Sequence, residues 1–218
     1  MKITKIEPQK KRAARLNIYA DGEFLIGVAA DTLLRFGLRT GDDISPATVR
    51  ALERAEELFG ARGAALRLLA VRQRTVREIR DALREKEFAD DIAAEIIASL
   101  SEARLLDDAA FARAYIRNAL ALRPAGVVLL RRKLLLLGVD RNVADEALKE
   151  TLQTVSQPEA AAGAARKFLA RKRRAHGADA RLREQLVQFL MRRGYTWEVV
   201  EEAVRSVLKG TSGDGEQL

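Results

Sequence analysis

The chain has no cysteine, a single histidine at position 176 and few aromatic residues, which make up 5% of its 218 residues. The absence of cysteine excludes disulfide bonds and thiolate-bound metal sites. One histidine cannot build a multi-histidine metal site, and a cysteine–histidine catalytic pair is excluded as well. The cysteine and histidine counts do not exclude catalysis by serine or carboxylate side chains, but no motif in the sequence supports an enzyme.

Long apolar segments are also missing. No run approaches the roughly 18 apolar residues that a membrane-spanning helix requires. The first residues, Met1-Lys2-Ile3-Thr4-Lys5, alternate in polarity and are unlike a signal peptide. We therefore expect a cytoplasmic protein without membrane contact.

Positive charge is in excess. The chain carries 39 lysine and arginine residues against 31 acidic residues, a net charge of +8, and its pI is about 10.0. This surplus favours a polyanionic partner, either nucleic acid or an acidic protein surface. The alternative is a solvated basic surface. A chain of this length forms one or two domains with a hydrophobic core.

The N-terminal residues contain the only convincing β pattern. Apolar residues alternate on both sides of Asp21-Gly22, a dipeptide typical of type I′ hairpin turns. Residues 3–6 are expected to add a third strand that ends at Pro8. A short helix should follow and close near Gly37, and Ser45 should cap the next helix.

The stretch from Leu105 to Ile116 has the pattern of a helix start. Asp107 is predicted to be the N-cap, because its carboxylate can accept a hydrogen bond from a free backbone N–H of the first turn. Leu106 and Phe111 occupy the two positions of a hydrophobic staple. The pair Asp107-Asp108 could instead bind a metal or act in acid–base catalysis, but no ligand-type residues stand at suitable spacing around it.

A weak internal repeat runs through the remaining helical sequence. The aligned segments are residues 80–100, 131–151 and 187–207, with Leu83, Leu134 and Leu190 at the shared position. Gly138 and Gly194 follow at equivalent positions, as in helices that end at a left-handed glycine with an apolar contact beyond it. Glu87 takes that position in the first repeat, where the same conformation costs on the order of 1 kcal/mol.

The repeat offsets of 51 and 56 residues leave room for three helices each. The sequence therefore predicts a mainly α fold with three tandem three-helix repeats in an elongated, curved array, and a small N-terminal β-hairpin and helix extension. The expected boundaries are 1–60 for the extension, 61–104, 105–152 and 153–209 for the repeats, and 210–218 for a disordered tail. The first repeat should contain a separate helix over 64–72 and a capping box at Thr75-Val76-Arg77-Glu78.

Basic residues gather on corresponding helices of the repeats. The candidate partner- and DNA-binding residues are Arg72, Arg74, Arg77, Arg80, Arg84, Arg131, Arg132, Lys133, Arg171, Lys172, Arg173 and Arg174. Guanidinium groups suit phosphates and carboxylates equally, so charge alone does not separate DNA from an acidic protein groove. Each cluster taken singly could also be an ordinary solvated helix face. Few base-discriminating side chains accompany these residues, so contacts should go to the backbone of DNA.

Several motifs resemble the RecX family. Residues 65–75, ALRLLAVRQRT, with Leu83, are similar to its first module, as is LSEARLLDD at 100–108. Gly126, followed by RRKL and then LGV at 137–139, resembles the second-module pattern. The match spans roughly 61–205, with Leu-Leu-Asp-Asp its most specific part and a generic third repeat. The N-terminal hairpin resembles an extension of some members, while Glu87 and the apolar run at 127–130 depart from the family pattern.

The resemblance implies a non-enzymatic regulator of the RecA recombinase. Such proteins lodge in the groove of the RecA–single-stranded-DNA filament and lower its ATPase and strand-exchange activity, within homologous recombination, DNA repair and the SOS response. The expected partners are the RecA filament and single-stranded DNA, with double-stranded DNA a further candidate. We expect a monomer without cofactor, metal or catalytic residues. No nucleotide site is expected either, because no Gly-Lys-Ser/Thr phosphate loop is present. The alternative is a basic helical protein that binds the DNA backbone directly, without RecA.

Overall fold

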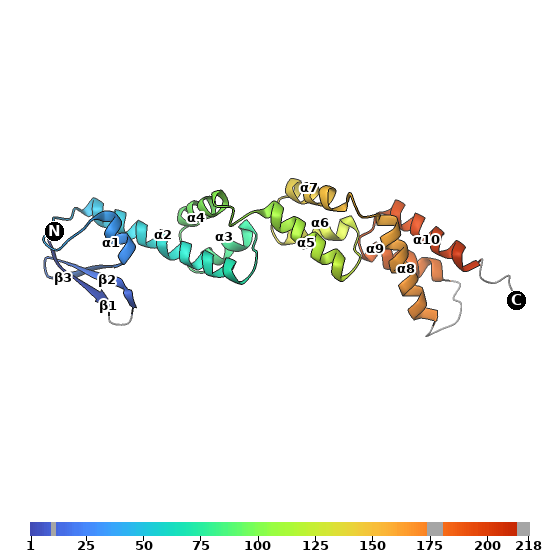
Figure 1. The fold of residues 1–218 in the computed structure, drawn as a ribbon, viewed down its shortest axis with the longest axis horizontal. Coiled ribbons are helices and arrows are strands. Elements are labelled where there is room, and N and C mark those ends of the chain that lie inside the picture. Colours follow the sequence, from blue (N-terminus) through green and yellow to red (C-terminus); the bar gives the residue numbers. More distant parts are fainter. Residues whose placement is uncertain (10–11, 174–180, 213–218) are drawn as a thin grey trace. The chain divides into compact units, whose positions relative to one another are not determined.

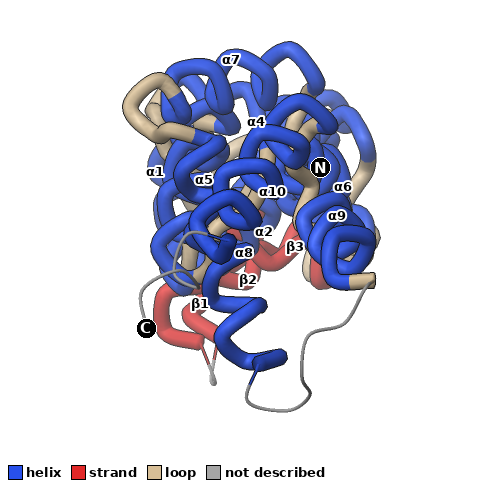
Figure 2. The backbone as a smooth tube through the Cα atoms, turned by 90° about the vertical axis from the view of Figure 1, so that its right-hand side faces the viewer, coloured by secondary structure: helices blue, strands red, loops and turns tan. Residues whose placement is uncertain are grey.

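The computed structural model describes residues 1–9, 12–173 and 181–212. Three strands and a succession of helices follow one another along the chain (Figure 1). Their bounds are β1 Ile3–Gln9, β2 Arg12–Ala20, β3 Glu23–Ala29, α1 Ala30–Phe36, α2 Pro46–Val71, α3 Val76–Arg84, α4 Asp90–Glu102, α5 Asp108–Leu122, α6 Val127–Leu136, α7 Arg141–Leu152, α8 Gln157–Arg173, α9 Leu182–Arg192 and α10 Trp197–Ser212. Helices dominate the described chain, and its strands are confined to β1–β3 (Figure 2).

The chain forms two compact units. The first comprises Met1–Gln73 and Ile79–Leu105, and the second comprises Arg74–Glu78 and the chain from Leu106 onward. The short segment 74–78, which contains the first residues of α3, therefore packs with the second unit. We call α5–α7 the second module and α8–α10 the third module. The predicted elongated and curved arrangement of the repeats stays a prediction.

The N-terminal sheet is antiparallel with the strand order β1-β2-β3. The Asp21-Gly22 turn has positive φ at both residues, 50° and 89°, which confirms the predicted type I′ hairpin. The predicted end of β1 at Pro8 was wrong, because Pro8 pairs with Leu16 and the strand continues to Gln9. An edge strand tolerates proline, since one row of its backbone groups has no partner strand.

Helix α1 and the start of α2 follow their sequence signals. Gly37 closes α1 in the left-handed conformation, and the Ser45 side chain accepts a hydrogen bond from the Thr48 N–H. The predicted break before residue 64 was wrong, because α2 runs unbroken over 26 residues. Gly60 lies within it and faces the ring of Phe88, 3.5 Å from where a Cβ atom would stand. A glycine inside a helix costs only about 1 kcal/mol relative to alanine, so Gly60 does not interrupt α2.

Ion pairs tie α2 to its neighbours in the first unit. Glu56 pairs with Arg15 at 2.9 Å and also accepts a hydrogen bond from the Ala29 N–H at 2.8 Å, linking α2 to the sheet. Arg54 binds Asp91 at 2.5 Å and Glu95 at 2.8 Å on α4. The hydrogen bond from Arg54 lowers the pKa of Asp91 below its ordinary value.

The repeat is visible in three equivalent turns. The N–H groups of Phe88, Val139 and Tyr195 donate to the carbonyls of Leu83, Leu134 and Leu190, each of which is fully buried. The residue before each donor is left-handed, with φ of 86° at Gly138 and 79° at Gly194. Glu87 keeps the same conformation at 64° without being glycine. These turns confirm the predicted helix ends, and they place the repeat leucines in the cores.

The C-terminal end differs from the expected tail. Helix α10 continues to Ser212, so the predicted disorder from residue 210 was wrong for its first three positions. Residues 213–218 of the expected tail lie outside the described residues. No helix in the described part of the chain is both long and apolar enough to span a membrane.

Candidate nucleic-acid and protein interface

The Leu-Leu-Asp-Asp stretch builds helix starts. Asp107 caps α5 and accepts a hydrogen bond from the Ala110 N–H at 2.8 Å, as predicted. Asp108 accepts one from the Val76 N–H at 2.9 Å, at the first residue of α3. Both carboxylates therefore compensate the positive end of a helix. Among the described residues, no group of three or more histidine and acidic side chains could hold a metal ion.

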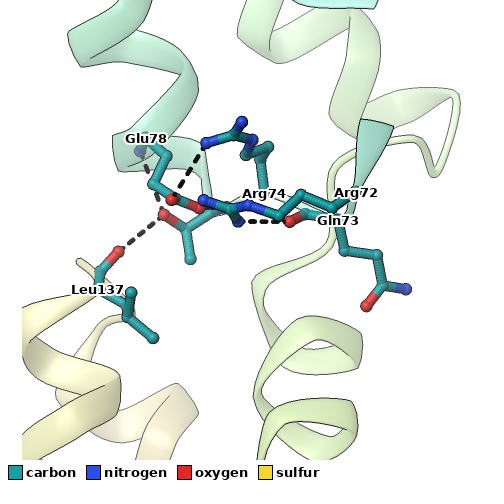
Figure 3. Close-up of polar contacts among 6 residues, drawn as sticks. Arg72, Gln73, Arg74, Glu78 and Leu137 are labelled. Atoms are coloured by element: carbon teal, nitrogen blue, oxygen red, sulfur yellow. Dashed lines mark hydrogen bonds and ion pairs between the residues drawn. The ribbon is translucent and has the colours of Figure 1, made fainter. Parts of the chain in front are cut away.

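The capping box that opens α3 is present and is joined to α6. The Thr75 and Glu78 side chains each accept a hydrogen bond from the other residue's N–H at 3.1 Å. The buried Thr75 hydroxyl donates to the Leu137 carbonyl at 2.8 Å (Figure 3). The Nη1 atom of Arg74 lies 3.5 Å from the Oε1 atom of Glu78, and only 24% of the Arg74 side chain is exposed. Of the predicted contact residues, Arg74 is thus engaged in this joint.

Two further predicted arginines, Arg72 in the first unit and Arg77 in the second, each have a contact within their own unit. Arg72 is exposed and donates to the Gln73 carbonyl at 2.8 Å (Figure 3). The side-chain stem of Arg77 covers Gly138, so that a Cβ atom there would lie 2.3 Å from the Arg77 Cδ atom. Gly138 is therefore required both by its left-handed backbone and by this close approach.

The other basic residues of α3 point to solvent in the first unit. Arg80 is exposed, and it has no ion pair among the residues that the structure describes. Arg84 is also exposed and pairs with Asp90 at 3.1 Å, with 60% of its side chain accessible. Surface pairs of this kind contribute little to stability, so Arg84 can exchange partners at small cost.

The basic run on α6 divides in the same way. Arg131 is bonded to Asp145 on α7, which fixes its guanidinium against the second module. Arg132 and Lys133 are exposed, and neither forms an ion pair within the described part of the chain. The periodicity of the helix turns Arg132 away from the buried Leu130 and Leu134, whereas Lys133 lies beside that buried face.

On α8 the structure places part of the predicted cluster. Arg171 is exposed near the end of the helix. Lys172 and Arg173 complete α8, and Arg174 lies outside the described residues. Arg166 and Lys167 are exposed one turn earlier and extend the basic surface beyond the residues selected from the sequence.

The predicted residues are therefore divided between the units. Arg72, Arg80 and Arg84 belong to the first unit, whereas Arg74, Arg77 and the residues on α6 and α8 belong to the second. Arg74 and Arg77 lie near the end of α6. Thr75, next to Arg74, donates to the Leu137 carbonyl, and the Arg77 side chain covers Gly138.

A backbone joint links the second and third modules. The N–H groups of Gly126 and Val128 donate to the carbonyls of Arg193 and Gly194 at 2.9 and 3.0 Å. These carbonyls supply the caps for α6 that its glycine N-cap lacks. Arg193, which the sequence prediction did not select, donates from Nη1 to the Pro124 carbonyl at 2.9 Å. Its guanidinium also lies over the Phe189 ring, 4.7 Å from the centroid.

Comparison with known families accounts for most of the chain. The regulatory protein RecX N-terminal domain matches residues 1–45. The first, second and third three-helix domains of RecX match residues 61–100, 107–148 and 159–204. The observed order of sheet and three-helix modules follows this succession.

Individual relatives agree with the family models. A regulatory protein RecX of Staphylococcus saprophyticus is 30% identical over 200 residues, covering 92% of this chain and 72% of that protein. One of Bacillus subtilis is 30% identical, covering 94% and 76%. A crystal structure of regulatory protein RecX superimposes with a TM-score of 0.75 at 28% identity, covering 92% of this chain and 97% of the other. A RecX structure from Lactobacillus salivarius covers 70% and 97%, with a TM-score of 0.64 and 25% identity.

The chain thus contains the three successive three-helix domains that the repeat pattern predicted, whereas the predicted boundaries between them stay a prediction. With four successive domain models matched and relatives aligned over more than nine-tenths of its length, the chain belongs to the RecX family of regulatory proteins.

Proposed function

We propose that this chain regulates RecA by binding in the groove of the RecA–single-stranded-DNA filament, where it lowers ATP hydrolysis and strand exchange. The observation that carries the proposal is a set of exposed cations on α3, on the second module and on the third module. Arg80, Arg132 and Arg171 are exposed and form no ion pair among the described residues. In this proposal the chain acts as a cytoplasmic monomer and has no catalytic activity of its own.

Exposed guanidinium groups suit a mixed surface of protein and nucleic acid. They bind carboxylates and phosphates in the same bidentate geometry, so one basic surface can contact acidic side chains and DNA backbone together. The modules offer few side chains that read bases, which fits a partner whose DNA sequence varies. A filament repeats its surface along one axis, as the modules repeat along the chain.

The test is a titration of RecA ATPase activity on single-stranded DNA. The wild-type chain is expected to slow ATP hydrolysis as its concentration rises. The triple variant Arg80→Glu, Arg132→Glu and Arg171→Glu should need at least tenfold more protein for the same effect. An unchanged ATPase rate across the wild-type titration would refute the proposal.

A matched control separates the site from net charge. Arg35, Arg39 and Arg50 are also exposed and lie outside the predicted clusters. Their reversal to glutamate changes the total charge by the same amount as the first triple variant. It is expected to leave inhibition within twofold of wild type, and an equal loss would mean that only total charge matters.

The second candidate is direct binding to the DNA backbone without RecA, which the same exposed cations favour. Binding to a naked single-stranded oligonucleotide would then weaken steeply with salt, with a log–log slope of about −0.7 for each phosphate neutralised. The triple variant should flatten this slope by about 2. Binding that is undetectable or insensitive to salt would remove this candidate.

A further inference from the structure

A pocket in the second unit is lined by Lys133 but by none of Arg80, Arg132 and Arg171, the cations on which the proposed function rests. It lies between the C-terminal part of α5, the α5–α6 loop and α6, with Arg193 of the third module at its edge, and encloses about 710 Å³. We call it the α5–α6 pocket. Its lining includes the apolar residues Ala119, Ala125, Leu129 and Leu130. This apolar lining suits a hydrophobic side chain better than a hydrated ion.

The rim of the α5–α6 pocket is positive. Arg123, Lys133 and Arg193 line it, and none of the acidic side chains that the structure describes does. The hydrogen bond from Arg193 to the Pro124 carbonyl and its position over Phe189 hold this cation in place. Arg123 and Lys133 are exposed, without ion pairs in the described part of the chain. A bound group that carries carboxylates would find partners here that the protein itself does not supply.

Large apolar side chains are exposed beside the pocket. Leu122, which also lines it, is 84% exposed, and Leu136 is 71% exposed. Leu129, Lys133 and Leu136 recur at helical spacing, which places Leu136 on the side of α6 that lines the pocket. The apolar residues of α6 therefore divide into two groups. Leu130 and Leu134 fill the core, whereas Leu136 is exposed to solvent.

We propose that the α5–α6 pocket binds an acidic protein segment through a large aliphatic or aromatic anchor. The anchor enters between α5 and α6, covering Leu122 and Leu136, and flanking carboxylates pair with Arg123 and Lys133. The proposal rests on the proposed function, because it assigns this surface to the protein component of the filament. DNA fits less well, since a polar phosphate backbone would leave both leucines in water.

The first test uses the double variant Leu122→Ser and Leu136→Ser, which changes only exposed side chains. Co-sedimentation with RecA–single-stranded-DNA filaments is expected to weaken at least tenfold, while affinity for the naked oligonucleotide stays within twofold. Leu34 and Val71, 77% and 79% exposed in the first unit, supply the matched control. Their replacement by serine should leave both affinities within twofold.

A second probe does not depend on RecA. The dye 8-anilinonaphthalene-1-sulfonate combines an aromatic body with an anionic group and so matches the proposed chemistry. Its fluorescence should rise with the wild-type chain and fall by at least half with Leu122→Ser and Lys133→Glu combined. Circular dichroism of each variant should remain that of wild type.

The outcomes separate this proposal from the proposed function. If the leucine variant binds filaments as well as the wild type, or if the wild type gives no dye response, the proposal for the α5–α6 pocket is overturned. The proposed function is then unaffected. Equal losses of DNA and filament binding would make the pocket a nucleic-acid surface and overturn the proposal for it too. A wild-type chain that responds to the dye but fails to sediment with filaments overturns the proposed function and, with it, the assignment of the pocket to the protein component of the filament.

Discussion

Replacing Gly126 with alanine should open the joint between the second and third modules. The Gly126 N–H donates to the Arg193 carbonyl at 2.9 Å, and the Val128 N–H donates to the Gly194 carbonyl at 3.0 Å. A Cβ atom on Gly126 would lie 2.1 Å from the Gly194 carbonyl oxygen. Because that oxygen belongs to backbone, no side-chain rotation can relieve the clash.

The size of the effect follows from this geometry. A carbon–oxygen contact settles near roughly 3.3 Å, so the two backbones must separate by about 1 Å. Overpacking of this kind costs about 1–3 kcal/mol. The two hydrogen bonds across the joint, each contributing about 1 kcal/mol, would weaken together. We therefore expect the Gly126→Ala variant to lose about 3 kcal/mol in its free energy of unfolding.

Urea unfolding measures this loss. Far-UV circular dichroism follows the helices, and Trp197, the single tryptophan, reports on the third module through its fluorescence. The matched control is Gly163→Ala on α8, where a Cβ atom would meet nothing within 4 Å. The control should gain up to about 1 kcal/mol, because alanine favours a helix interior over glycine. If Gly126→Ala unfolds at the wild-type urea concentration, the close approach of the two modules is not as described.

Three further variants test local features by the same unfolding measurement. Glu87→Gly should raise the free energy of unfolding by about 1 kcal/mol, because Glu87 holds a φ of 64°; a decrease would mean that its side chain stabilises the turn. Asp107→Ala should lower it by about 1 kcal/mol through loss of the Ala110 cap, and no change would contradict that role. Tyr195→Phe should be neutral or stabilising, because the buried Tyr195 hydroxyl has no hydrogen-bond partner in the described structure. Burial raises the pKa of Tyr195, so the wild type should lose stability as pH rises above about 10, whereas the variant should lose less.

Local sequence determined the helix ends and turns. Asp21-Gly22, Ser45 and the Thr75–Glu78 capping box were predicted because each satisfies its own neighbouring backbone within a few residues. Gly138 and Gly194 were predicted for the same reason. The core leucines at the repeat positions followed from periodicity, since a helix buries one face.

The tertiary structure decided which polar groups are already engaged. Asp108 was placed in a helix start, but its bond to Val76 joins residues 32 positions apart. Arg131 and Arg132 are adjacent in sequence, yet among the described residues only Arg131 meets a carboxylate, at Asp145 on the next helix. No local pattern distinguishes such neighbours, because the distinction depends on which helix packs against which face.

Glycine shows the same division between sequence and fold. The left-handed conformation of Gly194 ends its own helix, so the residues around it are enough to predict it. The need for glycine at position 126 arises only when another module's backbone comes into contact with it. Likewise, the contact of Gly60 in α2 with the Phe88 ring joins residues that are distant in sequence. Local backbone preferences depend on consecutive residues and can be predicted from them. Steric contacts between distant segments exist only once the chain has folded.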